Sequence, residues 1–146
     1  MSRIAVVVLA AGAATRFGSP KQTLLLPLVL ERLAGSPVDE VVVVEGAHEL
    51  DGTVLPAGTR VVPCAGWARG PGASLRCGLE ALASDVTAAV VVLADGPDLS
   101  PAAVGRVIEA WRAGAGDVVA ASYQGVRGHP LLVARPAWAA VPDARL

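Results

Sequence analysis

The sequence predicts an α/β fold in which a mostly parallel sheet lies between layers of helices. Three observations predict it. Apolar residues form continuous runs, which are typical of strands buried on both faces. Segments with helical spacing alternate with these runs, and this order favours parallel strands joined by helical crossovers. A length of 146 residues suits one domain with a single core.

The predicted elements follow one another along the chain. Four apolar runs predict strands at residues 4–10, 41–44, 88–94 and 117–121. Helices are predicted for the leucine-rich segment that ends at Leu33, for residues 72–84 and for residues 101–113. Gly35 and Pro37 stop the first helix. Ser100 before Pro101 is a typical N-cap followed by proline at the first helical position.

Composition excludes several classes of protein. The formal net charge is -1, so no overall positive field is available to hold nucleic acid or an anionic membrane. The first apolar run stops at Gly12, whereas a spanning helix needs roughly 20 apolar residues, so we expect a cytoplasmic protein. Cys64 and Cys77 form neither a CxxC pair nor a zinc pattern with the histidines, and we expect two buried, reduced thiols.

The segment LAAGAATRFGSPKQ runs directly out of the first predicted strand. Its small residues expose backbone donors, and Arg16 and Lys21 add two cations, which together favour a polyphosphate. It is not a P-loop, because Lys21 stands three residues after Gly18, and position 14 is alanine where the dinucleotide fingerprint needs glycine. The alternative is an ordinary strand-to-helix connection with solvated cations.

Asp95 follows the apolar run AAVVVLA and therefore stands at the carboxyl end of a predicted strand. A carboxylate suits Mg²⁺, which usually takes one or two protein carboxylates together with substrate phosphates and water. The alternative is an Asx turn before Gly96 and Pro97. We expect both loops, after Leu9 and after Ala94, at the carboxyl edge of the sheet, where α/β folds bind ligands.

The pattern LAAG-x-x-x-R-F-G-x-x-K, which ends at Lys21, resembles the signature of the MobA-like NTP transferases, and especially of the molybdenum-cofactor cytidylyltransferases. The segments GWARGPGASLRCGLEAL, LADGPDLSPAAV and RGHPLLV continue the likeness in order. The resemblance implies a three-layer Rossmann-like nucleotidyltransferase fold. It also implies Mg²⁺-dependent transfer of a nucleoside monophosphate from an NTP to a phosphate-bearing acceptor such as the molybdopterin cofactor, with release of pyrophosphate. The LAAG form of the loop implies CTP.

The resemblance also implies the site residues. Arg16, Lys21 and Asp95 would be catalytic, with Asp95 as the metal ligand. The nucleotide would contact Leu9, Ala10, Ala11, Gly12, Arg16, Lys21, Gly72 and Ser74. Ser74 has a second interpretation as a helix-terminal cap, and Gly72 has one as part of a turn with Pro71. His129 either contacts the acceptor or shapes a loop before Pro130.

Two features depart from the family pattern. The segment TLLLPLVLERL lacks the small-residue turn that usually follows the loop, and the late G-D-x-G-A motif is absent. We therefore expect a single MobA-like domain over residues 1–146, shortened at its carboxyl end. Two alternatives remain open at this point: a catalytically weak nucleotide-binding module, and a sugar- or alcohol-phosphate nucleotidyltransferase. The sequence predicts neither a general base nor an oligomeric state.

Overall fold

The computed structural model describes residues 3–10, 15–16, 19–46, 58–94, 100–123 and 126–142. Its strands are β1 (Arg3–Ala10), β2 (Thr15–Arg16), β3 (Ser19–Pro20), β4 (Glu40–Glu45), β5 (Thr59–Pro63), β6 (Val86–Leu93), β7 (Val118–Tyr123) and β8 (Val126–Ala134). Its α-helices are α1 (Lys21–Leu33), α2 (Pro71–Glu80) and α3 (Pro101–Arg112), and its 3-10 helices are η1 (Trp67–Arg69) and η2 (Arg135–Ala140).

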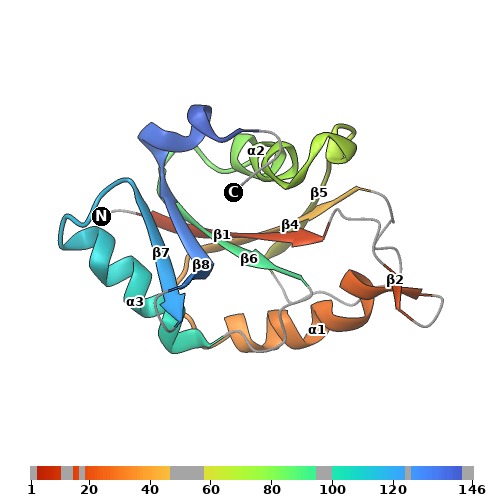
Figure 1. Ribbon diagram of the computed structural model, residues 1–146, viewed down its shortest axis with the longest axis horizontal. Coiled ribbons are helices and arrows are strands. Elements are labelled where there is room, and N and C mark those ends of the chain that lie inside the picture. Colours follow the sequence, from red (N-terminus) through yellow and green to blue (C-terminus); the bar gives the residue numbers. More distant parts are fainter. Residues whose placement is uncertain are drawn as a thin grey trace.

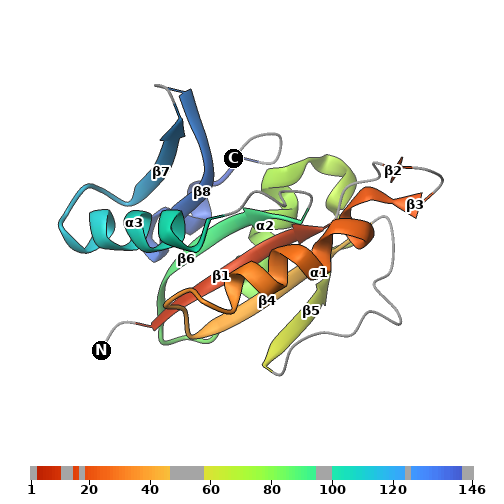
Figure 2. The ribbon, with the colours of Figure 1, turned by 90° about the horizontal axis from the view of Figure 1, so that it is seen from below.

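A six-stranded sheet in the order β5-β4-β1-β6-β8-β7 forms the middle layer. Strands β5, β4, β1 and β6 are parallel, whereas β8 runs antiparallel to both of its neighbours. Helix α2 covers one face of this sheet, and α1 and α3 cover the other (Figure 1). The view from below shows α1 and α3 side by side on their face (Figure 2). The α/β, mostly parallel prediction is therefore confirmed.

The side chains of β1 divide between two hydrophobic cores because successive residues of a strand point to opposite faces. Val6 and Val8 pack with α1 and α3, whereas Val7 packs with α2. All three are fully buried. The prediction of a strand buried on both faces is confirmed for β1, which lies at the centre of the sheet. It is wrong for β7, which is an edge strand and leaves Val118 49% exposed.

All four predicted strands and all three predicted helices are present, with shifted ends. Helix α1 begins at Lys21 and contains Pro27. Helix α2 ends at Glu80, with Ala81 as its C-cap, whereas the predicted helix continued to Ser84. Ser100 caps α3 as expected, since its side chain accepts a hydrogen bond from Ala103 N. Strands β5 and β8 were not among the predicted elements.

A second correction concerns the cysteines. Cys64 and Cys77 form a disulfide, with their Cα atoms 5.8 Å apart, so the prediction of reduced thiols is wrong. Cys64 follows β5, and α2 packs against the end of the sheet where β5 stops. The fold thus brings together two residues whose spacing in the sequence gave no such indication. Among the described helices, none is long and apolar enough to cross a bilayer.

Candidate nucleotide site

The carboxyl ends of β4, β1 and β6 form one continuous edge. Leu9 is paired with Leu93, and Ala10 is paired with Glu45. Beyond the last paired residues, Ala94 N donates to Leu9 O over 3.0 Å. The loop after β1 and the loop after β6 therefore leave the sheet from adjacent positions, as expected.

This edge is also where the strand order reverses. From β1 the chain moves outward to β4 and β5, and it then returns through α2 to β6 on the other side of β1. Such a switch point separates the connections on either side and opens a crevice at the carboxyl edge, where ligands of α/β sheets bind.

The structure describes only part of the first predicted loop. Leu9 and Ala10 end β1 and are buried. The hairpin of β2 and β3 follows, with Arg16 opposite Ser19, and Lys21 is the first residue of α1. This hairpin extends beyond the carboxyl edge of the sheet (Figures 1 and 2).

Several predicted site residues lie outside the described residues. These are Ala11, Gly12 and Asp95, together with the side chains of Arg16 and Lys21. The assignment of these residues to phosphate and metal binding therefore stays a prediction.

Helix α2 begins at the same edge without a side chain to cap it. Its N-cap is Gly70, whose φ of 134° and ψ of 172° suit glycine alone, and Pro71 is the first helical residue. The first N–H groups of a helix have no partner within it, so this start offers backbone donors to an anion.

Ser74 lies just inside α2 and is 3% exposed. Within the described ranges, it is the one buried residue with a polar or charged side chain. Because Gly70 is the N-cap and makes no side-chain cap hydrogen bond, the interpretation of Ser74 as the helix cap is wrong. Gly72 is also buried and belongs to the helix rather than to the preceding turn. Both residues therefore remain candidates for contact with the nucleotide.

The segment between β5 and α2 is compact. Cys64 N donates to Glu45 O over 2.8 Å and so extends the parallel register past β5. The η1 turn follows, in which Gly70 N donates to Trp67 O. A Cβ on Gly66 would lie 2.6 Å from Arg69 Nη2, so glycine there allows the guanidinium to pack closely over the turn. Trp67 packs against the core on the α2 face.

His129 lies in β8 and is partly buried, so the interpretation that it shapes a loop is wrong. Leu131 is paired with Val91, and β8 runs antiparallel to β6. Residues of β8 that precede Leu131 therefore lie toward the carboxyl end of β6, on the side where the acceptor is predicted. Contact between His129 and the acceptor stays a prediction.

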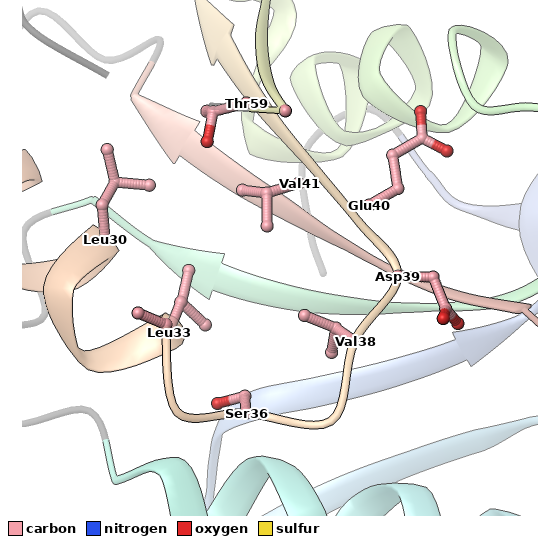
Figure 3. Close-up of a pocket in the computed structure, with 10 residues that line it drawn as sticks. Leu30, Leu33, Ser36, Val38, Asp39, Glu40, Val41 and Thr59 are labelled. Carbon is pink, nitrogen blue, oxygen red and sulfur yellow. The ribbon is translucent and has the colours of Figure 1, made fainter. Parts of the chain in front are cut away.

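A shallow hollow of about 280 Å³ lies at the opposite, amino edge of the sheet. Leucine side chains of α1 line it together with Val38 and Val41, and Ser36 and Asp39 are polar residues beside them, whereas the side chain of Glu40 points away from the leucines (Figure 3). Its lining provides carboxylates and no cation, so it is unsuited to a polyphosphate.

Metal binding would depend on few protein ligands. In the part of the chain that the structure describes, no three histidine, cysteine, aspartate or glutamate side chains gather to hold an ion. A Mg²⁺ ion needs only one or two protein carboxylates when phosphates and water complete its shell, and its binding to this chain stays a prediction. The single carboxylate predicted for it, that of Asp95, comes directly after the buried Ala94 at the carboxyl edge.

A mostly parallel sheet between two helical layers, with a topological switch point at its carboxyl edge, defines a Rossmann-like α/β fold. Residues 6–145 match the MobA-like NTP transferase domain, and the chain belongs to that family. The predicted family is therefore confirmed.

Individual relatives agree with this membership. The chain is 42% identical over 121 residues to a 2-C-methyl-D-erythritol 4-phosphate cytidylyltransferase of Stenotrophomonas maltophilia; the match covers 73% of this chain and 52% of that protein. The chain thus spans about half the length of the curated relatives that it matches.

Solved structures of one mycobacterial protein are also similar. The crystal structure of Rv0371c from Mycobacterium tuberculosis superposes with a TM-score of 0.83 at 28% identity, covering 96% of this chain and 75% of that one. Its complex with manganese superposes with a TM-score of 0.72 at 28% identity, over 99% of this chain and 77% of that chain.

Proposed function

We propose that this chain is a cytidylyltransferase that moves CMP from CTP to a phosphate-bearing acceptor and releases pyrophosphate. The observation that carries the proposal is the hydrogen bond from Ala94 N to Leu9 O, which joins the starts of the two predicted chemical loops. Membership in a family of NTP transferases supports the same reaction type. The LAAG form of the loop and the likeness to a named cytidylyltransferase both favour cytidine.

The acceptor class is a small molecule with a phosphate monoester. The motif likeness to the molybdenum-cofactor branch favours molybdopterin. The relative at 42% identity is named for 2-C-methyl-D-erythritol 4-phosphate, which favours an alcohol phosphate. Both acceptors offer the same nucleophile, so the chemistry at the NTP is the same for both.

In the proposed reaction, a phosphate oxygen of the acceptor attacks the α-phosphorus of CTP. A new phosphorus–oxygen bond forms as the bond to the departing pyrophosphate breaks. A phosphate monoester is already largely ionised near neutral pH, so the attack needs no general base. The protein contributes mainly positioning and charge neutralisation.

Each proposed site residue has a distinct part in this scheme. The planar fork of Arg16 would hold phosphate oxygens in a fixed orientation, and Lys21 would act as a point charge that follows the leaving pyrophosphate. Asp95 would hold Mg²⁺, which when bound neutralises charge on the phosphates. The first turn of α2, with Gly72 and Ser74, would face the nucleoside part of CTP.

The test begins with nucleotide binding. The full chain is heated with CTP, GTP, ATP or UTP, each with and without Mg²⁺, and its melting temperature is recorded. Stabilisation by CTP that requires Mg²⁺ is the expected result. Stabilisation by another NTP would overturn the choice of base, and no stabilisation by any NTP would overturn the proposed function.

The second part separates an enzyme from a weak binding module. Pyrophosphate release from CTP is measured with molybdopterin and with 2-C-methyl-D-erythritol 4-phosphate as separate acceptors. Release with one of them is expected and identifies the acceptor. CTP binding without release with either acceptor would overturn the transferase reaction and favour the binding module.

A further inference from the structure

The disulfide closes a ring around the segment that forms one side of the candidate site. Cys64 is 3% exposed and lies one residue beyond β5, at the carboxyl edge. Cys77 is partly buried and lies within α2. The bond between them joins the end of a strand to the helix that packs over it.

The enclosed segment contains three glycines, and its hydrogen bonds to the rest of the fold lie near its two ends, from Cys64 N to Glu45 O and from the side chain of Arg76 to Val141 O. Gly66, Gly70 and Gly72 give its backbone unusual freedom, and glycine loses more conformational entropy on ordering than any other residue. Between these ends, the backbone hydrogen bonds of the η1 turn are local, such as that from Arg69 N to Gly66 O. The disulfide is therefore the covalent constraint that holds the η1 turn against α2.

We propose that this disulfide is a redox-sensitive latch on the nucleotide site. In the oxidised chain, the segment from Cys64 to Ser74 is held in one arrangement, and the first turn of α2 is ready to meet CTP. Reduction releases the ring, so binding must then order the glycine-rich segment, and CTP affinity falls. The inference rests on the proposed function and concerns the regulation of that same site.

The chemical step is exchange with a dithiol reductant. A thiolate of the dithiol attacks Cys77 sulfur, the more accessible of the two, and Cys64 leaves as a thiolate. The second thiol of the reductant then attacks the mixed disulfide and releases the Cys77 thiolate. Two electrons pass to the protein, the dithiol becomes a disulfide, and both cysteine thiolates can take up protons.

Thermodynamic linkage requires that CTP binding and disulfide formation affect each other equally. If the oxidised form binds CTP more tightly by some factor, bound CTP favours the oxidised form by the same factor. Saturating CTP should therefore raise the ratio of dithiol to its disulfide that reduces half of the protein, by the ratio of the two dissociation constants.

The test measures CTP binding by calorimetry on the full chain, once oxidised and once reduced with dithiothreitol. We expect binding to weaken on the order of tenfold on reduction, within the usual range of coupling between sites. The double variant Cys64→Ser/Cys77→Ser should bind like the reduced chain and show no response to dithiothreitol. Equal dissociation constants for the two redox states of the unmodified chain would overturn the inference.

A second readout does not depend on nucleotide. Trypsin can cut after the exposed Arg69, inside the ring, and the products are quantified by mass spectrometry after quenching and full reduction. Cleavage should be faster in the reduced chain while circular dichroism stays unchanged. Equal cleavage rates would overturn the latch. Absence of CTP binding in both redox states, together with unequal cleavage, would overturn the proposed function and leave the latch standing.

Discussion

The two edges of the sheet are built in different ways. At the amino edge, side chains fasten the strand starts: Asp39 accepts a hydrogen bond from Ile4 N, Arg60 pairs with Glu40, and Arg135 Nε donates to Val86 O. At the carboxyl edge, the described contacts between strand ends are backbone hydrogen bonds, such as that from Ala94 N to Leu9 O.

This difference between the edges suggests that the amino edge serves stability and the carboxyl edge serves ligand binding. At the amino edge, these side-chain contacts occupy backbone groups at the strand starts, so fewer of those groups are left for a ligand. An edge that ends in small residues and an uncapped helix start leaves donors available. We therefore expect substitutions at the amino edge to change the free energy of unfolding, and substitutions at the carboxyl edge to change turnover.

The largest effect is expected at the carboxyl edge. Lys21→Ala and Arg16→Ala should each lower cytidylyl transfer about 100-fold or more, because each removes a cation from developing phosphate charge. Their melting temperatures should stay near that of the unmodified chain. Arg112→Ala is the matched control, since it removes an exposed arginine on α3, and it should keep full turnover. Near-native turnover in either variant would remove that residue from the site.

The largest effect on stability is expected between the two edges, where α2 packs against the sheet. A Cβ on Gly78 would lie 2.6 Å from Val7 Cγ1 and 2.8 Å from Val44 Cγ2, and both valines are fully buried. Gly78→Ala should lower the free energy of unfolding by about 1–2 kcal/mol, because overpacking outweighs the gain in helix propensity. Urea denaturation measures it.

The matched control for Gly78 lies in α3. A Cβ on Gly105 would have no neighbour within 4 Å, so Gly105→Ala should stabilise the fold by about 0.5–1 kcal/mol. Equal stabilisation by both substitutions would show that α2 does not depend on close approach to β1 and β4.

A loss of similar size is expected at the amino edge itself. Asp39 N donates to Ile4 O and Asp39 Oδ2 accepts from Ile4 N, each over 2.8 Å. Asp39→Ala leaves the backbone N–H of Ile4 without its acceptor and should cost about 1–2 kcal/mol in unfolding free energy. Turnover at saturating CTP should not change. A loss of turnover at unchanged stability would contradict the separation of the two edges.

The smallest effect is expected for the exposed ion pair at the same edge. Arg3 and Asp85 are 2.9 Å apart, with side chains 39% and 59% exposed. Asp85→Ala should cost no more than about 1 kcal/mol in unfolding free energy. The difference from the unmodified chain should shrink in about 0.5 M NaCl, because salt screens exposed charges. A difference that is independent of salt would assign the effect to packing or helix-end contacts instead.

The parallel half of the sheet was predictable because β1, β4 and β6 are continuous valine-rich runs. Strand β5 was missed because its sequence TRVVP is short and partly exposed, with proline at its end. Strand β8 was missed because Gly128 and Pro130 interrupt it, and proline is uncommon within sheets. Its antiparallel direction depends on long-range pairing with β6, which no local pattern encodes.

Less of the candidate site can be compared. The apolar runs correctly predicted that the ends of β1 and β6 lie at one edge, whereas the side chains of the loop residues and Asp95 lie outside the described residues and their roles stay predictions. The disulfide was not predictable, because the contact between Cys64 and Cys77 arises from the packing of α2 on the sheet. The burial of Ser74 likewise follows from which side of α2 meets the core.

The central position of β1 has a consequence for folding during synthesis. Its two partners are made at different times: β4 follows it closely, whereas β6 ends at Leu93. At about 5–20 residues per second, the ribosome needs several seconds to travel from one partner to the other. During that interval, the N–H and C=O groups along one side of β1 have no partner strand. Such an open strand edge can pair with a strand of another nascent chain. The return of the chain through α2, which pairs β6 with β1, thus also covers this open edge.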